Sequence, residues 1–109
     1  RGDWTAASGF AAASALGDGV PALFCANDQM ALGALRALAD RGRRVPEDVA
    51  VVGFDDIADA ADYRPPLTTL RQDFDGLGRA AIASLVARIE GDPVAPVLLR
   101  PELVIRASA

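Results

Sequence analysis

Ala22-Leu-Phe-Cys-Ala26 is followed directly by Asn27-Asp28, and Val49-Ala-Val-Val-Gly-Phe54 is followed directly by Asp55-Asp56. A continuous apolar run of this length predicts a strand buried on both faces, as in a parallel sheet with helices on either side. The segment between the runs is long enough for a helix, which indicates a strand–helix–strand unit. In such folds small ligands bind beyond the carboxyl ends of the strands, where both polar pairs lie.

The composition limits the chemistry that this chain can perform. With 109 residues, 51% of them hydrophobic, it forms at most one domain. A net charge of −4 argues against nucleic-acid binding by these residues alone, because phosphate binding requires a concentrated basic surface. All eleven basic residues are arginine and there is no histidine, which excludes lysine Schiff bases, His-activated nucleophiles and His-ligated metals. The single cysteine, Cys25, cannot form an intrachain disulfide, and we interpret it as apolar filler.

Capping residues and prolines predict the remaining elements. Asp28 is the expected N-cap of the second helix, and Gly42 ends that helix. Pro65-Pro66 excludes helix and favours an extended approach to the next strand. We predict helices over residues 6–16, 30–39 and 74–89, and further strands over 67–70, 97–99 and 103–105.

Two of these helices have a defined apolar side. In the second helix Leu32 lies off the inward stripe, which consists of Ala31, Ala34, Leu35 and Leu38. In the last helix one face is formed by Phe74, Leu77, Ala81, Ile82, Leu85 and Ile89.

The pair Asp55-Asp56 has several interpretations. It could act as acid and base, bind a divalent metal, or accept hydrogen bonds from neighbouring sugar hydroxyls. A phosphoacceptor site is a further option, although its usual lysine is missing. The structural alternative is a cap or a turn, which we favour for Asp28 and Asp56. Asn27 is then available for a ligand, because an amide both donates and accepts hydrogen bonds.

Trp4 is the only tryptophan and lies outside any helical stripe. A lone tryptophan is more often part of a core, but its place at a predicted strand-to-helix junction favours an apolar platform for a sugar ring. Phe74 fits its helix stripe and is expected in the core, while Gln72 and Asp73 have capping as their structural alternative.

Four motifs in order resemble the lactose-repressor (LacI/GalR) family of bacterial transcription regulators, from residue 2 to about residue 106. They are Gly2-Asp-Trp-Thr-Ala-Ala-Ser-Gly-Phe10, Ala26-Asn-Asp-Gln-Met-Ala-Leu-Gly-Ala-Leu35, Val45-Pro-Glu-Asp-Val-Ala-Val-Val-Gly-Phe-Asp-Asp56 and Pro65-Pro-Leu-Thr-Thr-Leu-Arg-Gln-Asp-Phe74. The resemblance implies an α/β, parallel-sheet, periplasmic-binding-protein-like sensor domain, which this chain carries incompletely. Residues 1–71 would belong to the C-terminal lobe, 72–100 to a crossover and helix of the N-terminal lobe, and 101–109 to a return strand.

The resemblance also implies roles for individual residues. Trp4 would stack on a sugar, and Asn27 and Asp55 would hydrogen-bond its hydroxyls. Gln72 and Phe74 would help form the cleft between the lobes. The residues implied in dimer contacts are Leu32, Asp59 and Tyr63.

Together these observations predict the effector-sensing and dimerisation part of a cytoplasmic repressor that needs no cofactor and has no catalytic or metal site. The partners would be a sugar or polyol effector, a second copy of the chain, and operator DNA through an N-terminal domain outside these residues; a membrane is not expected. A sugar-binding protein of a transport system is the alternative, and an enzyme using the aspartate pair ranks below it. We also expect a neighbouring copy to cover the apolar face of the last helix.

Overall fold

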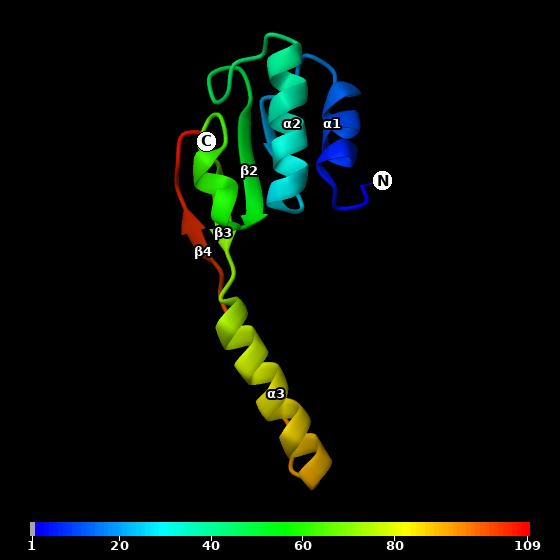
Figure 1. The fold of residues 1–109 in the computed structure, drawn as a ribbon, viewed down its shortest axis with the longest axis vertical. Helices are drawn as coiled ribbons and strands as arrows, with labels where there is room; N and C mark the ends of the chain where they lie inside the picture. Colours follow the sequence, from blue (N-terminus) through cyan, green and yellow to red (C-terminus); the bar gives the residue numbers. More distant parts are fainter. Residues whose placement is uncertain (1) are drawn as a thin grey trace. The chain divides into compact units, whose positions relative to one another are not determined.

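The computed structural model describes residues 2–109, which form two compact units. The first unit extends to Arg71 and includes Glu102–Ala109, and the second unit is Gln72–Pro101. The elements are α1 (Ala6–Ser14), β1 (Ala22–Phe24), α2 (Asp28–Asp40), β2 (Ala50–Asp55), the 3₁₀ helix η1 (Ala58–Asp62), β3 (Thr68–Arg71), α3 (Phe74–Glu90) and β4 (Glu102–Val104) (Figure 1).

A four-stranded sheet in the order β1-β2-β3-β4 forms the centre of the first unit. Strands β1, β2 and β3 are parallel, so their carboxyl ends lie at one edge of the sheet. Strand β4 is antiparallel to β3, and the sheet is therefore mixed where a parallel sheet was predicted. The reason is that the chain leaves the sheet at Arg71 and returns at Glu102, its register partner, so it runs back along the strand it left.

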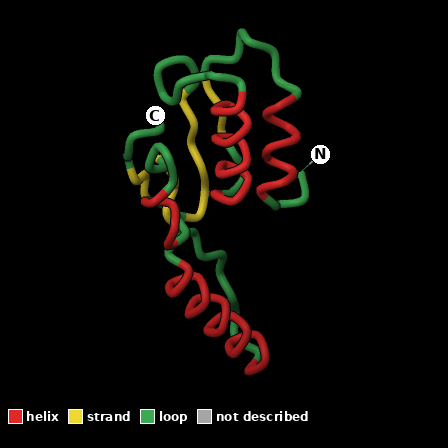
Figure 2. The backbone as a smooth tube through the Cα atoms, turned by 45° about the horizontal axis from the view of Figure 1, so that its top comes forward, coloured by secondary structure: helices red, strands yellow, loops and turns green. Residues whose placement is uncertain are grey.

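Helices α1 and α2 lie side by side in both views (Figures 1 and 2). Glycines at their contact permit this close approach. A Cβ atom on Gly33 would lie 1.8 Å from the carbonyl oxygen of Ala6, and one on Gly9 would lie 2.1 Å from that of Met30. Neither backbone can retreat without separating the helices, so both positions require the absence of a side chain.

The main core lies between α2, β2, η1 and the start of β3. The predicted inward stripe of α2 is confirmed, because all four of its residues are buried, while Leu32 is 42% exposed. Burial of such side chains contributes roughly 1.5–3 kcal/mol each for the larger aliphatic residues. The core cluster consists of Ala31, Leu35, Leu38, Val49, Val51, Ala60, Tyr63 and Leu67.

The opposite face of the sheet is exposed in the described residues, whereas the apolar runs predicted strands buried on both faces. Phe24 is 66% exposed and Leu103 is 54% exposed. The Phe24 ring meets the ring of Phe54 edge-on, with centroids 6.5 Å apart. Side chains alternate along a strand, so Leu23 is partly buried and packs against the core while its neighbour Phe24 points away from it.

The C-terminal residues fasten the amino-terminal ends of β2 and β3 together. The hydroxyl of Ser108, which is fully buried, donates to the carbonyl of Val51 (2.6 Å) and accepts from the backbone N–H of Thr68 (2.8 Å). The N–H of Val51 donates to the carbonyl of Ser108 (2.7 Å). Residues near the end of the chain are thus part of the sheet of the first unit.

The second unit is built around α3. Asp73 caps its amino terminus by accepting a hydrogen bond from the N–H of Gly76 (2.8 Å), and Gly91 (φ 86°) ends it in the left-handed conformation. No α3 residue is buried, and Phe74, expected in the core, is 54% exposed. The strand predicted over 97–99 is not formed. This segment lies between two prolines, Pro96 and Pro101, which lack the N–H groups that strand pairing needs.

Gly33→Ala tests the close contact between α1 and α2. Alanine favours helix by up to about 1 kcal/mol over glycine, but here its methyl group would collide with backbone, and overpacking costs about 1–3 kcal/mol. We expect a net loss in the free energy of unfolding, measured by urea titration. Gly78→Ala is the control, because a Cβ atom there meets nothing within 4 Å and should stabilise α3. Equal effects of the two substitutions would contradict this account.

Candidate functional site

The carboxyl edge of the parallel strands gathers three predicted site residues, two of them with positive φ angles. Asn27 follows β1, Asp55 ends β2, and Trp4 precedes α1. In residues 2–109, the non-glycine residues with positive φ are Trp4 (70°), Asp55 (108°) and Asp56 (54°). Such conformations cost of order 1–3 kcal/mol and are found where the surroundings fix them, often at binding sites.

A short hydrogen-bonded turn holds Trp4. The carboxylate of Asp3 accepts from the N–H (3.1 Å) and hydroxyl (2.6 Å) of Thr5, and the hydroxyl of Ser8 accepts from the N–H of Asp3 (3.2 Å). Hydrogen bonds from Thr5 and Ser8 lower the pKa of Asp3 to about 2. The Trp4 side chain itself is 64% exposed. The backbone is thus fastened while the indole ring remains accessible.

Asn27 connects this turn to α2. Its side-chain amide donates to the carbonyl of Trp4 (3.0 Å), and its side-chain oxygen accepts from the N–H of Met30 (2.8 Å). Asn27 is therefore the N-cap of α2, and the prediction that Asp28 would be the cap is wrong. Asn27 is 7% exposed, and its amide retains one N–H beyond the bond to Trp4.

Asp28 is buried and joins three elements instead of capping one. Its carboxylate accepts from the hydroxyl of Thr69 in β3 (2.6 Å) and from the N–H of Ile57, just beyond β2 (2.9 Å). Gly53 makes room for it, because a Cβ atom there would lie 2.2 Å from the Asp28 Oδ1 atom. Each oxygen thus has a partner, as a buried carboxylate requires. Because Asn27 is the N-cap of α2, the Asp28 carboxylate is not needed as a cap and can accept hydrogen bonds from Thr69 and Ile57.

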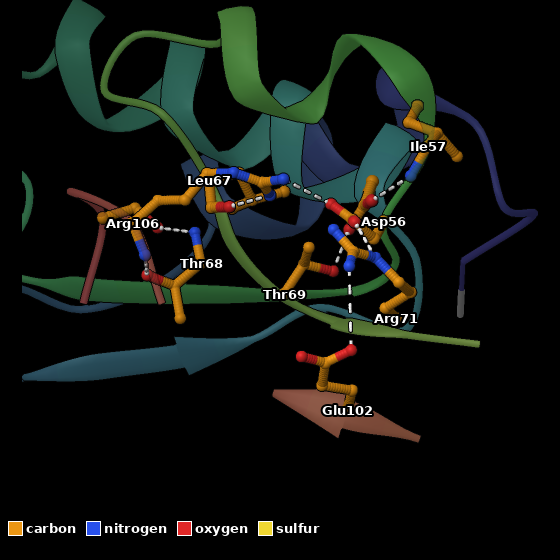
Figure 3. Close-up of polar contacts among 10 residues, drawn as sticks. Asp56, Ile57, Leu67, Thr68, Thr69, Arg71, Glu102 and Arg106 are labelled. Atoms are coloured by element: carbon orange, nitrogen blue, oxygen red, sulfur yellow. Dashed lines mark hydrogen bonds and ion pairs between the residues drawn. The ribbon is translucent and has the colours of Figure 1, made fainter. Parts of the chain in front are cut away.

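Asp56, predicted as a cap or turn residue, lies in the turn after β2 and forms the centre of an ion cluster in which its own side chain is buried and that of Arg71 is half exposed (Figure 3). Its Oδ2 atom lies 2.7 Å from Nε of Arg71, and its Oδ1 atom lies 2.7 Å from Nη2 of Arg106. The Asp56 side chain is 6% exposed. Desolvation raises its pKa, but the hydrogen bonds and charges of Arg106 and Arg71 outweigh that effect and hold the pKa below its ordinary value.

This arrangement does not favour the acid–base interpretation of the aspartate pair. The low pKa of Asp56 keeps it ionised and paired, so it has no proton to donate near neutral pH. The thiol of Cys25 is equally inactive, because burial and the charge of Asp28 raise its pKa to about 11. Within residues 2–109 no group of three or more His, Cys, Asp and Glu side chains is placed to hold a metal ion.

The remaining predicted site residues lie elsewhere. Gln72 and Phe74 belong to the second unit. Leu32 lines an apolar groove of about 600 Å³ between α1 and α2, and the other lining residues are Ala6, Ala7, Phe10, Gly33 and Arg36.

The two other predicted dimer residues differ in exposure. Asp59 is exposed on η1, whereas Tyr63 is 8% exposed and belongs to the main core. Tyr63 therefore has a structural role in this chain, and little of its surface remains for a partner.

The sequence did not identify the arginines and the threonine that bind the two buried aspartates. Arg71 and Arg106 are 35 positions apart, and Thr69 is 41 positions from Asp28, so no local spacing relates them. The sequence offered one indirect indication of these partners. Arg71 directly follows the predicted strand over 67–70, and Arg106 directly follows the predicted strand over 103–105.

Comparisons with known proteins agree with this structure. A model of the periplasmic binding protein-like domain matches residues 1–109. The chain is 44% identical over 109 residues to the lactose operon repressor of Escherichia coli K12, covering 97% of this chain and 30% of that protein. It is 47% identical over 108 residues to the HTH-type transcriptional regulator MalR of Streptomyces coelicolor, covering 96% and 31% respectively.

Solved structures show the same similarity. The lac repressor dimer bound to operator and the anti-inducer ONPF matches with a TM-score of 0.90 and 45% identity over 98% of this chain and 34% of that chain. The complex of the transcriptional regulator CelR with cellobiose matches with a TM-score of 0.90 and 46% identity over 99% and 35%. The chain thus spans about a third of the length of these relatives. It belongs to the periplasmic binding protein-like domain family, which confirms the predicted fold class, and the predicted similarity to repressors of the lactose-repressor type is confirmed.

Acid should weaken the fold through Asp56. Its folded-state pKa lies below the unfolded value of about 3.9, so its stabilisation is complete above that value and is lost as the pH falls through the folded pKa. We expect the urea midpoint to decrease as the pH falls below about 4, and to decrease less in Asp56→Asn, whose side chain does not titrate. An unchanged pH dependence in the variant would contradict the assignment.

Proposed function

We propose that the carboxyl edge of the sheet in the first unit binds the polyhydroxylated effector of a transcriptional repressor. The observation that carries this proposal is the link between Asn27 and the carbonyl of Trp4, which holds an exposed indole ring at the edge where Asp55 ends β2. An indole ring packs against the apolar face of a sugar, while a carboxylate and an amide hydrogen-bond its hydroxyls. A sugar or polyol presents both an apolar face and hydroxyl groups, so one ligand of this class can use all three side chains.

The relatives support this ligand class. The CelR structure contains cellobiose, and a LacI-family regulator from Arthrobacter, 37% identical to this chain, contains lactose. We infer by analogy that a saccharide or polyol binds at this edge of the first unit. The two units correspond in this proposal to parts of two lobes, with residues up to 71 and from 101 in one lobe and 72–100 in the other.

The effector would act by differential affinity for two conformations of the complete repressor. A ligand that binds one arrangement more tightly shifts the population toward it and, by linkage, changes the affinity for operator DNA. DNA would be contacted by segments outside these residues, because this chain is acidic. We place the protein in the cytoplasm as a regulator, not in a transport system, because the relatives named above are regulators. No helix within residues 2–109 is long and apolar enough to cross a membrane.

A second copy of the chain is the proposed protein partner, through contacts that include Leu32 on α2 and Asp59 on η1. Leu32 is a half-exposed leucine on the groove between α1 and α2, and a related lac repressor structure is a dimer. Leu32→Asp in the full-length gene product should shift light scattering from dimer to monomer, because a carboxylate would be desolvated in the interface. A variant that remains dimeric at low micromolar concentration would count against this surface.

Asp55→Ala tests the binding site. In the full-length gene product we expect saccharide affinity to fall by at least about tenfold, because a charge-assisted hydrogen bond is worth roughly 1.5–3 kcal/mol. Calorimetric titration with cellobiose and lactose measures this. Asp62→Ala is the matched control, since Asp62 is an exposed carboxylate on η1. Unaltered affinity in Asp55→Ala, with binding by the original protein, would exclude Asp55 from the site.

A further inference from the structure

The ion cluster around Asp56 lies where the chain passes between its two units. Arg71 is the last residue before Gln72–Pro101, and Glu102 is the first residue after that segment. These two residues are register partners in β3 and β4, and the Arg71 Nη1 atom lies 3.7 Å from Oε2 of Glu102 (Figure 3). Both connections to the second unit therefore leave from a single rung of the sheet, the Arg71–Glu102 rung.

Asp56, which directly follows the predicted ligand residue Asp55, binds Arg71 of this rung. It accepts from Nε of Arg71 at 2.7 Å, and Arg106, two residues beyond β4, contacts its other oxygen. Arg106 is itself fixed, because it also donates to the carbonyl of Leu67 (2.8 Å). The hydrogen bond from Arg71 and the ion pair with Arg106 are both 2.7 Å long and are made to an almost fully buried carboxylate, so they resist displacement more than exposed ion pairs do. The contact to Glu102 is longer and exposed, and contributes less.

Asp56 also follows Asp55 directly in the turn after β2. Asp55 and Asp56 both have positive φ angles, 108° and 54°, which are uncommon for non-glycine residues, although aspartate adopts the left-handed region more readily than most. On the far side of the turn, the N–H of Ile57 is held by Asp28. The turn is therefore anchored at two points. The anchor at Asp56 reaches the side chain of Arg71 directly, and the backbone of Asp55 is the register partner of Arg71 in the pairing of β2 with β3.

We propose that Asp56 is a positioning residue that links the conformation of the Asp55 turn to both connections between the two units. This inference rests on the proposed function for the role of Asp55 as a ligand residue. A displacement of Asp55 on binding would move the Asp56 carboxylate and, with it, the guanidinium of Arg71. The link needs no contact between Asp56 and the effector.

Hydrogen exchange of the ligand-free, full-length gene product tests the link without requiring a known effector. In Asp56→Asn we expect amides in two separate segments, residues 55–57 and the rung at 71 and 102, to exchange at least about tenfold faster than in the original protein. The matched control is Asp48→Asn, which removes another aspartate ion pair of 2.7 Å, to Arg44, outside the cluster. It should leave both segments unchanged. Faster exchange at the turn but not at the rung would overturn the proposal.

Measurements of saccharide affinity then distinguish a positioning role of Asp56 from a role in stability alone. Well below the melting temperature, cellobiose or lactose affinity should fall about tenfold in Asp56→Asn and remain unchanged in Asp48→Asn. Asp56→Glu restores the charge but moves it by one methylene group, so we expect it to recover melting temperature more than affinity. Full affinity in Asp56→Asn would refute the positioning role. If the original protein binds neither sugar, the proposed saccharide ligand fails, while the exchange experiment still decides the link.

Discussion

Burial of two aspartates beneath the turn that follows β2 is the constraint on which this structure depends. Asp28 ties that turn to β3 through Thr69, and Asp56 ties it to Arg71 and Arg106. A buried carboxylate that loses its partners is destabilising, because its charge is then neither solvated nor paired. The parallel strands therefore end at one edge with their connecting turn held in a single conformation.

The hydrogen bonds at the carboxyl edge of the sheet also order a surface that is suited to binding a ligand. Trp4 and Asp55 both have positive φ angles, and hydrogen bonds made by the side chains of Asp3 and Asn27 hold the backbone around Trp4. The indole ring of Trp4 remains exposed because its backbone, and not its side chain, is anchored. A site that is already ordered loses less entropy on binding, which supports the assignment of this edge to a small ligand.

The sequence predicted the parts of this structure that depend on local pattern. Helical periodicity placed the buried side of α2 and left Leu32 outside it, and the two apolar runs located β1 and β2. It failed where partners are distant. Asp28 and Asn27 are both good caps, and only the position of Thr69 decides between them. The exposure of Phe24 likewise depends on what covers the sheet, which periodicity cannot reveal.

The most direct measurement is a crystal structure of the full-length gene product with a bound saccharide, such as cellobiose. The account predicts hydroxyl oxygens of the sugar at about 2.6–3.2 Å from the Asp55 carboxylate and the Asn27 amide, with a ring face against Trp4. Asp56 should still be paired with Arg71 and Arg106. A saccharide bound away from this edge, with none of these three side chains in contact with it, would contradict the account.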